Sequence, residues 1–149
     1  MTEADVTGVV TLERASYQFP WSEGIFRDCL RVGYVCRVVI SGNKLIGYGV
    51  MSVGAGEAHI LNLCVDSSFR CQGIGRRMLD YLLDRGAAAG MGEAFLEVRP
   101  SNTAAIRLYL ALGFDQVGMR RGYYQAVGGR EDAAVLKLSL RGRRSRSAP

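Results

Sequence analysis

The sequence lacks the features that mark secreted, membrane-spanning and disordered proteins. Charged residues or glycines interrupt every apolar stretch well before the ~18 residues that would cross a membrane. The first residues, Met-Thr-Glu-Ala-Asp, are acidic where a signal peptide would be basic. Only 3 of the 149 residues are proline, and 48% are hydrophobic, so the chain should fold. We therefore expect a cytoplasmic protein with no membrane partner and one domain over residues 1–140.

Charge of one sign is also scarce once the C-terminal end is set aside. The formal net charge is +5, but Arg141, Arg143, Arg144 and Arg146 lie in a nine-residue tail, 141–149, that contains no acid. Without those four arginines, 15 cations face 14 acids, which is not the charge of a nucleic-acid-binding domain. The basic tail could touch RNA, but a solvated, disordered end is the simpler interpretation.

The chain also lacks a metal-ligand pattern. Its four cysteines, Cys29, Cys36, Cys64 and Cys71, are separated by 7, 28 and 7 residues, whereas zinc sites usually pair ligands about two to four residues apart. His59 is the only histidine. We expect no bound metal, and cysteines that are reduced and mostly fill the core.

Hydrophobic spacing and helix caps predict an α+β domain. Thr2 and Asp5 resemble a capping box for a first helix that ends near Gln18, and Ser22 can cap a second helix over 24–30. The remaining elements are predicted as three antiparallel strands within 34–65, a helix over 76–86, a strand over 94–99, a helix over 102–112, and strands over 114–119 and 133–140.

This order predicts a mixed, mostly antiparallel central sheet flanked by helices. Parallel pairing is expected only between the strand ending at Val65 and the strand ending at Val98, because a helix connects them. Where those two strands separate, we expect a cleft.

A glycine-rich turn opens the third predicted helix and consists of Arg70, Cys71, Gln72, Gly73, Ile74 and Gly75. Glycines let the backbone approach a ligand, and the first amides of a helix are unpaired donors at a positive dipole end, so such a turn can hold a pyrophosphate. Arg70 and Arg76 add positive charge. A glycine turn without any ligand fits the pattern equally well. The third glycine of the dinucleotide fingerprint and the Gly-Lys-Ser/Thr of a P-loop are both missing.

Three polar residues follow in positions that favour the same cleft. Glu97 projects from the middle of an otherwise apolar strand, on the face opposite Leu96 and Val98. In a half-buried cleft, desolvation would raise its pKa toward the range of a general base; a solvated or arginine-paired carboxylate is the alternative. Asn102 and Tyr109 share one face of the next helix, where Tyr109 could equally be a packing residue.

The motifs together resemble the GNAT acetyltransferase superfamily, over nearly the whole chain. The glycine turn resembles the acetyl-CoA motif of that superfamily. More specifically, the chain is similar to RimI-type ribosomal-protein alanine N-acetyltransferases in F-P-W-S (19–22), I-L-N-L-C-V-D (60–66), L-E-V-R-P-S-N-T-A-A-I-R-L-Y (96–109), L-G-F (112–114) and R-R-G-Y-Y-Q-A-V-G-G-R-E-D-A (120–133).

This resemblance implies that acetyl-CoA is the acetyl donor. The backbone of Leu63, Cys64 and Val65 would pair with the pantetheine arm like an added strand, and Asn102 would bond the same region. Backbone amides from Cys71 through Arg76 would hold the pyrophosphate. The residues that would shape a groove for the acceptor peptide are Phe19, Pro20, Trp21, Tyr123 and Tyr124.

The resemblance also implies a reaction by direct transfer in a ternary complex. Glu97 would act as general base, and Tyr109 would protonate the departing thiolate. The acceptor would be an N-terminal alanine of a protein such as the eighteenth protein of the small ribosomal subunit. One alternative is an acetyltransferase that acts on another protein N-terminus or on a small amine. The other is a module that binds acyl-CoA without catalysis. His59 would face the same cleft as these residues. It would either bridge to a water molecule or have no role in the reaction.

One departure from the resemblance concerns the N-terminal end. Relatives usually have a short strand before the first helix, whereas only Met1 precedes Thr2 here. We therefore expect an edge strand to be missing or the start to lie upstream.

Overall fold

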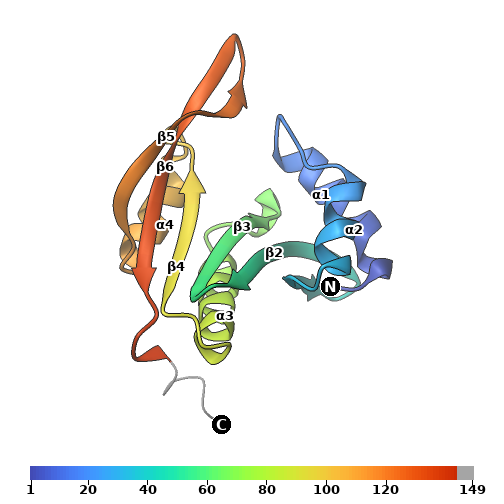
Figure 1. Ribbon diagram of the computed structural model, residues 1–149. Helices are drawn as coiled ribbons and strands as arrows, with labels where there is room; N and C mark the ends of the chain where they lie inside the picture. Colours follow the sequence, from blue (N-terminus) through green and yellow to red (C-terminus); the bar gives the residue numbers. More distant parts are fainter. Residues whose placement is uncertain (144–149) are drawn as a thin grey trace.

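A computed structural model describes residues 1–143 and contains one six-stranded sheet with helices on both faces (Figure 1). Its elements are η1 (Glu3–Asp5), α1 (Val6–Ser16), α2 (Glu23–Arg31), β1 (Val35–Ser41), β2 (Lys44–Gly54), β3 (Glu57–Val65), η2 (Ser67–Phe69), α3 (Ile74–Ala88), β4 (Glu93–Val98), α4 (Thr103–Ala111), β5 (Asp115–Ala126) and β6 (Gly129–Ser139). The order of elements is the predicted one. No helix in this described part of the chain is long and apolar enough to cross a membrane.

Side-chain caps explain where two of the helices begin. The side-chain oxygens of Ser22 and Asn102 each accept a hydrogen bond from the amide three residues later, at 3.3 and 3.2 Å. Helices α2 and α4 therefore start where the sequence predicts. Helix α1 ends at Ser16, two residues before the predicted Gln18, because the backbone of Tyr17 is already extended (φ −125°, ψ 141°).

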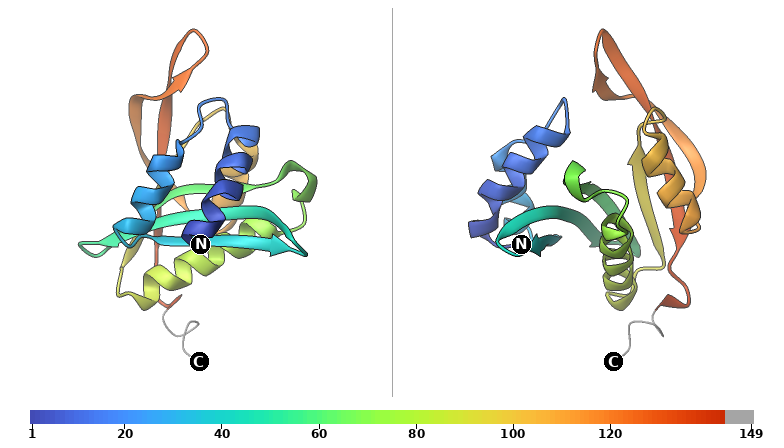
Figure 2. Two further views of the ribbon diagram at one scale, coloured as in Figure 1. Left: turned by 90° about the vertical axis from the view of Figure 1, so that its right-hand side faces the viewer. Right: turned by 180° about the vertical axis from the view of Figure 1, so that it is seen from behind.

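The strand order in the sheet is β1-β2-β3-β4-β6-β5. Neighbouring strands are antiparallel except β3 and β4, whose segments Glu57–Ile60 and Glu93–Leu96 pair in parallel. This confirms the predicted mixed sheet and its single parallel pair. Helix α3 connects the two parallel strands and packs against β2 and β3 (Figure 2). The β3–β4 pair joins a β1–β3 half of the sheet to a β4–β6 half.

Two hydrophobic cores lie on opposite faces of the sheet. Helices α1 and α2 cover one face of β1–β3, where Val9, Phe26 and Tyr48 are fully buried. Helices α3 and α4 pack on the other face, against a cluster that includes Leu96. Close packing of α3 on β2 depends on Gly49, because a Cβ atom there would lie only 2.8 Å from a methyl carbon of Leu82.

A β-bulge in β3 explains why the two halves of the sheet separate. Val50 pairs with Asn62 and Met51 pairs with Ile60, so Leu61 is an extra residue without a partner. Such a bulge bends its strand and increases the local twist. The parallel ladder with β4 ends at Ile60, at the same point. Beyond it, β3 and β4 diverge as predicted (Figure 1).

The last two strands are longer than predicted. The segment between 119 and 133, predicted to lie between the two strands, continues both of them into a hairpin whose turn follows Ala126. The register of β5 shifts between Arg120 and Tyr124, where Gly122 adopts a positive φ of 58°. A bulge therefore accommodates Gly122 within the strand.

The described part of the C-terminal end is packed rather than disordered up to Arg143. The Arg143 side chain is 10% exposed, and its guanidinium contacts Asp84 at 2.9 Å and Asp80 at 3.1 Å, both on α3. These contacts attach Arg143 to α3, and the domain boundary at residue 140 stays a prediction. The rest of the predicted basic tail, 144–149, lies outside the described residues.

Candidate active site

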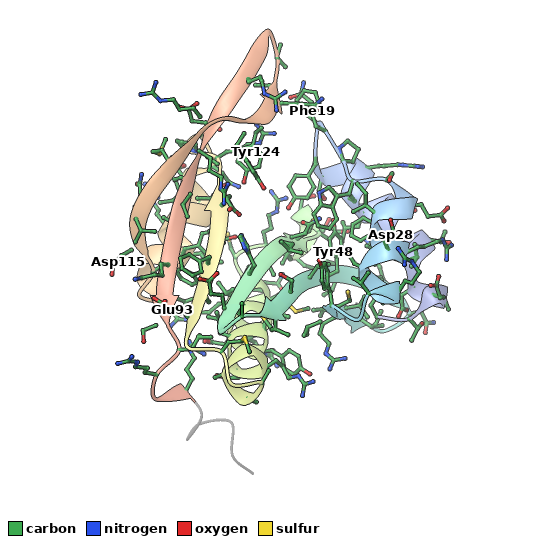
Figure 3. The ribbon with its side chains drawn as sticks, in the orientation of Figure 1. Phe19, Asp28, Tyr48, Glu93, Asp115 and Tyr124 are labelled. Carbon is green, nitrogen blue, oxygen red and sulfur yellow. The ribbon has the colours of Figure 1, made fainter. Side chains whose placement is uncertain are left out.

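A cavity of about 430 Å³ occupies the gap between the diverging strands β3 and β4. Its wall is built from the end of α1 and the loop after it, from β3, β4 and α4, and from the β5–β6 hairpin. Figure 3 shows Phe19 and Tyr124 on opposite sides of this gap. The predicted site residues that line the cavity are Phe19, Trp21, Leu63, Glu97, Asn102, Tyr109 and Tyr124.

The other predicted residues are not part of the cavity wall. They are Pro20, Cys64, Val65, Tyr123 and the glycine turn over 70–76. Pro20 is exposed between two residues that do line the cavity. Tyr123 is 47% exposed, and its ring lies 4.9 Å from the ring of Tyr124. Consecutive strand residues normally point to opposite faces, so the bulge in β5 explains how these two rings come together.

Both carboxylate oxygens of Glu97 are held by side chains from other strands. His59 on β3 lies with its Nε2 2.7 Å from Glu97 Oε2. Arg120 on β5 donates from Nε to Glu97 Oε1 at 3.1 Å, across the intervening β6. Only 8% of the Glu97 side chain is exposed. The carboxylate is thus a fixed, largely buried acceptor in the cavity wall.

The expected rise in the pKa of Glu97 is wrong. Burial is the largest single influence and raises the pKa, but the hydrogen bonds and charges of His59 and Arg120 together outweigh it. The pKa of Glu97 is therefore lowered from its ordinary value, and the carboxylate is ionised at neutral pH. The sequence pattern identified the buried strand position but not the two basic partners.

Tyr109 reaches the cavity from α4, on the opposite side of the sheet from the Glu97 carboxylate. It is 9% exposed and packs edge-on against Phe114, with the ring centroids 5.8 Å apart. Burial raises the pKa of Tyr109 to about 12. The phenol therefore stays protonated at neutral pH, the state that a general acid requires.

The edge of β3 beyond the bulge presents backbone groups to the gap. The carbonyl oxygen of Leu63 accepts a hydrogen bond from the Tyr17 hydroxyl at 2.9 Å, and that of Val65 accepts from Arg70 Nε at 3.3 Å. Since backbone groups alternate in direction along a strand, the amides of Leu63 and Val65 face the gap as well. Cys64 lies between them, opposite Tyr48 of β2, and its side chain is buried.

The glycine turn ends in a helix N-terminus with open amide donors. Gly73 precedes α3 with a φ of +78°, and Cys71 also has a positive φ, 63°. The amide of Arg77 is the first to bond back to the Gly73 carbonyl, at 3.0 Å. The amides of the first three residues of α3 precede that bond and have no acceptor within the helix. This turn can bind an anionic group through its backbone.

The sequence pattern missed a buried carboxylate in the cavity wall, Glu13 of α1. It is 2% exposed and accepts hydrogen bonds from the Tyr48 hydroxyl, from Asn62 Nδ2 at 3.0 Å and from the Trp21 amide at 2.8 Å. The available signal was its place in the apolar stripe of the first helix, where an acid needs polar partners. Glu13 links α1, β2, β3 and the loop that carries Trp21.

We expect Glu13→Ala to lower the free energy of unfolding by about 3 kcal/mol, because it leaves buried donors without an acceptor. Urea denaturation monitored by circular dichroism measures this loss. Glu3→Ala is the matched control, since Glu3 is 63% exposed and forms its ion pair with the exposed Arg27. That control should change stability by less than about 1 kcal/mol. Equal effects of the two substitutions would contradict the role assigned to Glu13.

Within residues 1–143, no three His, Cys, Asp or Glu side chains are placed to hold a metal ion. The site instead combines a held carboxylate, a buried phenol, an open strand edge and a helix N-terminus.

Known proteins share both the sequence and the arrangement of this chain. Residues 6–114 match the model of the Acetyltransferase (GNAT) family. The ribosomal protein bS18-alanine N-acetyltransferase of Escherichia coli (strain K12) is 35% identical over 136 residues, covering 91% of this chain and 92% of that protein. The protein of the same name from Salmonella typhimurium is 33% identical and covers 94% of this chain and 95% of that protein.

A solved structure agrees with these sequence relatives. The crystal structure of the ribosomal-protein-S18-alanine N-acetyltransferase from Escherichia coli superposes with a TM-score of 0.87 at 34% identity, covering 94% of this chain and 90% of that chain. The chain therefore belongs to the GNAT acetyltransferase family, whose members take the acetyl group from acetyl-CoA.

Proposed function

We propose that this acetyltransferase moves an acetyl group from acetyl-CoA to the α-amino group of a protein that begins with alanine, a bS18-type ribosomal protein, in the cytoplasm. The observation that carries the proposal is that Glu97 and Tyr109 line one and the same cavity at the splayed strands. The whole-length similarity to bS18-alanine N-acetyltransferases supports the choice of acceptor.

Acetyl-CoA would lie along the gap between β3 and β4. The amides of Leu63 and Val65 would pair with its pantetheine arm. Of the three residues that the resemblance implies for this role, Cys64 would not take part. Asn102 would contribute its side-chain NH₂ group, since its Oδ1 already caps α4. The backbone from Cys71 to Arg76 would bind the pyrophosphate, with Arg70 and Arg76 adding positive charge.

The acceptor amine would react from its neutral form. An α-amino group with a pKa of ~8 is neutral about one time in ten at pH 7, whereas a lysine side chain with a pKa of ~10.4 is neutral about once in a few thousand. The amine nitrogen attacks the thioester carbonyl, the new C–N bond forms, and the C–S bond breaks. The surplus proton of the nitrogen passes to Glu97, and Tyr109 gives its proton to the sulfur.

Aromatic residues on both sides of the cavity would hold the acceptor peptide. Phe19 and Trp21 come from the loop after α1, with Pro20 between them, and Tyr124 comes from the hairpin beside Tyr123. The guanidinium of Arg99 lies 4.4 Å from the centre of the Tyr124 ring. These rings offer rigid apolar contacts beside polar groups, as peptide grooves need.

Mass spectrometry of an alanine-starting peptide incubated with acetyl-CoA and the protein tests this function. We expect one added acetyl group, located at the N-terminus. The same peptide with a blocked N-terminus and an internal lysine is the control, and it should remain unmodified. Acetylation of only the lysine or of small amines would reject the proposed acceptor. Binding of acetyl-CoA with no acetylation of any amine would favour an acyl-CoA-binding module.

Gly73→Ala should weaken acetyl-CoA binding about ten-fold. Its φ of +78° disfavours any residue with a side chain, although a Cβ there would meet nothing within 4 Å. The effect therefore reports backbone strain at the pyrophosphate turn and not a clash. Gly128→Ala is a matched control, with the same φ of +78° and equally open space in the β5–β6 turn. Calorimetric titration should show normal acetyl-CoA affinity in that control; a loss in both variants would contradict the assignment.

A further inference from the structure

Glu97 is held from two sides by groups that are themselves more exposed. The His59 side chain is 32% exposed and the Arg120 side chain is 55% exposed, against 8% for Glu97. Each partner contacts a different carboxylate oxygen. Such a two-point contact fixes the rotation of a flexible glutamate side chain as well as its position.

The strand pairing of β3 with β4 positions His59 next to the Glu97 carboxylate. His59 is paired with Phe95 in the parallel ladder, one position before the ladder ends at Ile60 and Leu96. Its ring and the Glu97 carboxylate therefore project from the same sheet face, in neighbouring strands. Among the described residues, Glu97 is part of the cavity wall and His59 is not.

We propose that His59 is a positioning residue for the reaction: its ring holds Oε2 of Glu97 so that the carboxylate meets the acceptor amine, while Arg120 holds Oε1. This inference rests on the proposed function, in which Glu97 takes the proton of the amine. A misplacement of about 1 Å at a reacting group can cost about 100-fold in rate, so a fixed carboxylate matters.

The hydrogen bond has a second effect, on the charge of Glu97. His59 and Arg120 both lower the pKa of Glu97, so the base stays ionised below the pH at which a buried carboxyl group would otherwise take up a proton. Within residues 1–143, the ionisable groups near this pair include Tyr124, whose pKa Glu97 helps to raise, and Arg99, which forms an ion pair with Glu131 at 3.2 Å. Tyr123 lies near Glu97 and Arg120. Farther along the same face are Glu57, Glu93 and Lys137, of which the last two form an ion pair at 3.0 Å.

Two substitutions of His59 separate the hydrogen bond from the bulk of the ring. His59→Leu removes the donor, and we expect kcat for the alanine-starting peptide to fall about 30-fold while KM for acetyl-CoA stays within two-fold. His59→Gln keeps a donor and should recover most of the loss. In His59→Leu the acid limb of the pH–kcat profile should move to higher pH, because one of the groups that lowers the Glu97 pKa is gone.

Nuclear magnetic resonance gives a readout besides activity, because His59 is the only histidine in the chain. The imidazole ¹⁵N signals of the wild type should shift in Glu97→Gln, which loses the charged partner. Unchanged kcat and an unmoved acid limb in His59→Leu would overturn the inference. Equal losses in the leucine and glutamine variants, without movement of that limb, would overturn it as well.

These outcomes differ from a failure of the proposed function. If the wild type binds acetyl-CoA but acetylates no alanine-starting peptide, the acceptor assignment fails. The imidazole signals would still decide whether His59 and Glu97 are paired. Circular dichroism and acetyl-CoA titration establish that each variant is folded before its rate is interpreted.

Discussion

Glu97→Gln is expected to lower kcat for an alanine-starting peptide by a factor of 100 or more, with little change in KM for acetyl-CoA. The amide keeps the shape of the side chain but takes up no proton, and general bases typically contribute a factor of about 100 to 10,000. Both rates should rise toward pH 9 as a larger fraction of the α-amine becomes neutral, but the ratio between them should stay about constant, because Glu97 acts after the neutral amine has attacked. Steady-state kinetics between pH 6 and 9 measures both effects.

The control for this prediction comes from the same strand. Glu93 lies four residues earlier, is 44% exposed and pairs with Lys137. Glu93→Gln should leave kcat and the pH profile as in the wild type. If Glu97→Gln retained full activity at pH 7, Glu97 would not be the base, and the acceptor amine would lose its proton to water or to another group.

Tyr109→Phe should lower kcat about 100-fold, because the departing thiolate would then leave without a proton. Burial raises the pKa of Tyr109 to about 12, so in the wild type this phenol should produce no alkaline limb below about pH 11. Removal of one hydroxyl should preserve the packing against Phe114, and the thermal midpoint should change little. Rate measurements and a thermal melt together test the assignment.

Tyr81→Phe is the comparison for Tyr109→Phe. Tyr81 lies on α3, is 42% exposed and stacks with Arg37, away from the cavity wall. Its substitution should leave kcat unchanged. An alkaline limb near pH 9 that disappeared in Tyr109→Phe would show that the phenol ionises far more readily than its burial implies.

The sequence was sufficient for the parts of the fold that depend on local patterns. Helix caps at Ser22 and Asn102 and the alternation around Glu97 predicted where elements begin and which side chains face the gap. The extent of β5 and β6 could not be predicted in this way. Their glycines are typical of a connection, and only the pairing of the two strands makes a bulge at Gly122 favourable.

The electrostatics of the site depends on contacts between residues far apart in the chain. His59 is 38 residues from Glu97 and Arg120 is 23 residues away, so no local pattern relates the three. The same holds for Glu13, whose partners Tyr48 and Asn62 are 35 and 49 residues distant. Sequence spacing therefore identified the carboxylate at 97 but predicted the wrong direction for its pKa.

The short parallel ladder between β3 and β4 has a consequence for refolding. Only the segments Glu57–Ile60 and Glu93–Leu96 set the register of the two halves. A slip of one residue would turn Glu97 toward the helices and expose Leu96, because side chains alternate between the faces of a strand. A misregistered fraction would keep most of its secondary structure and yet be inactive, so active-site titration is a stricter measure of recovery than circular dichroism.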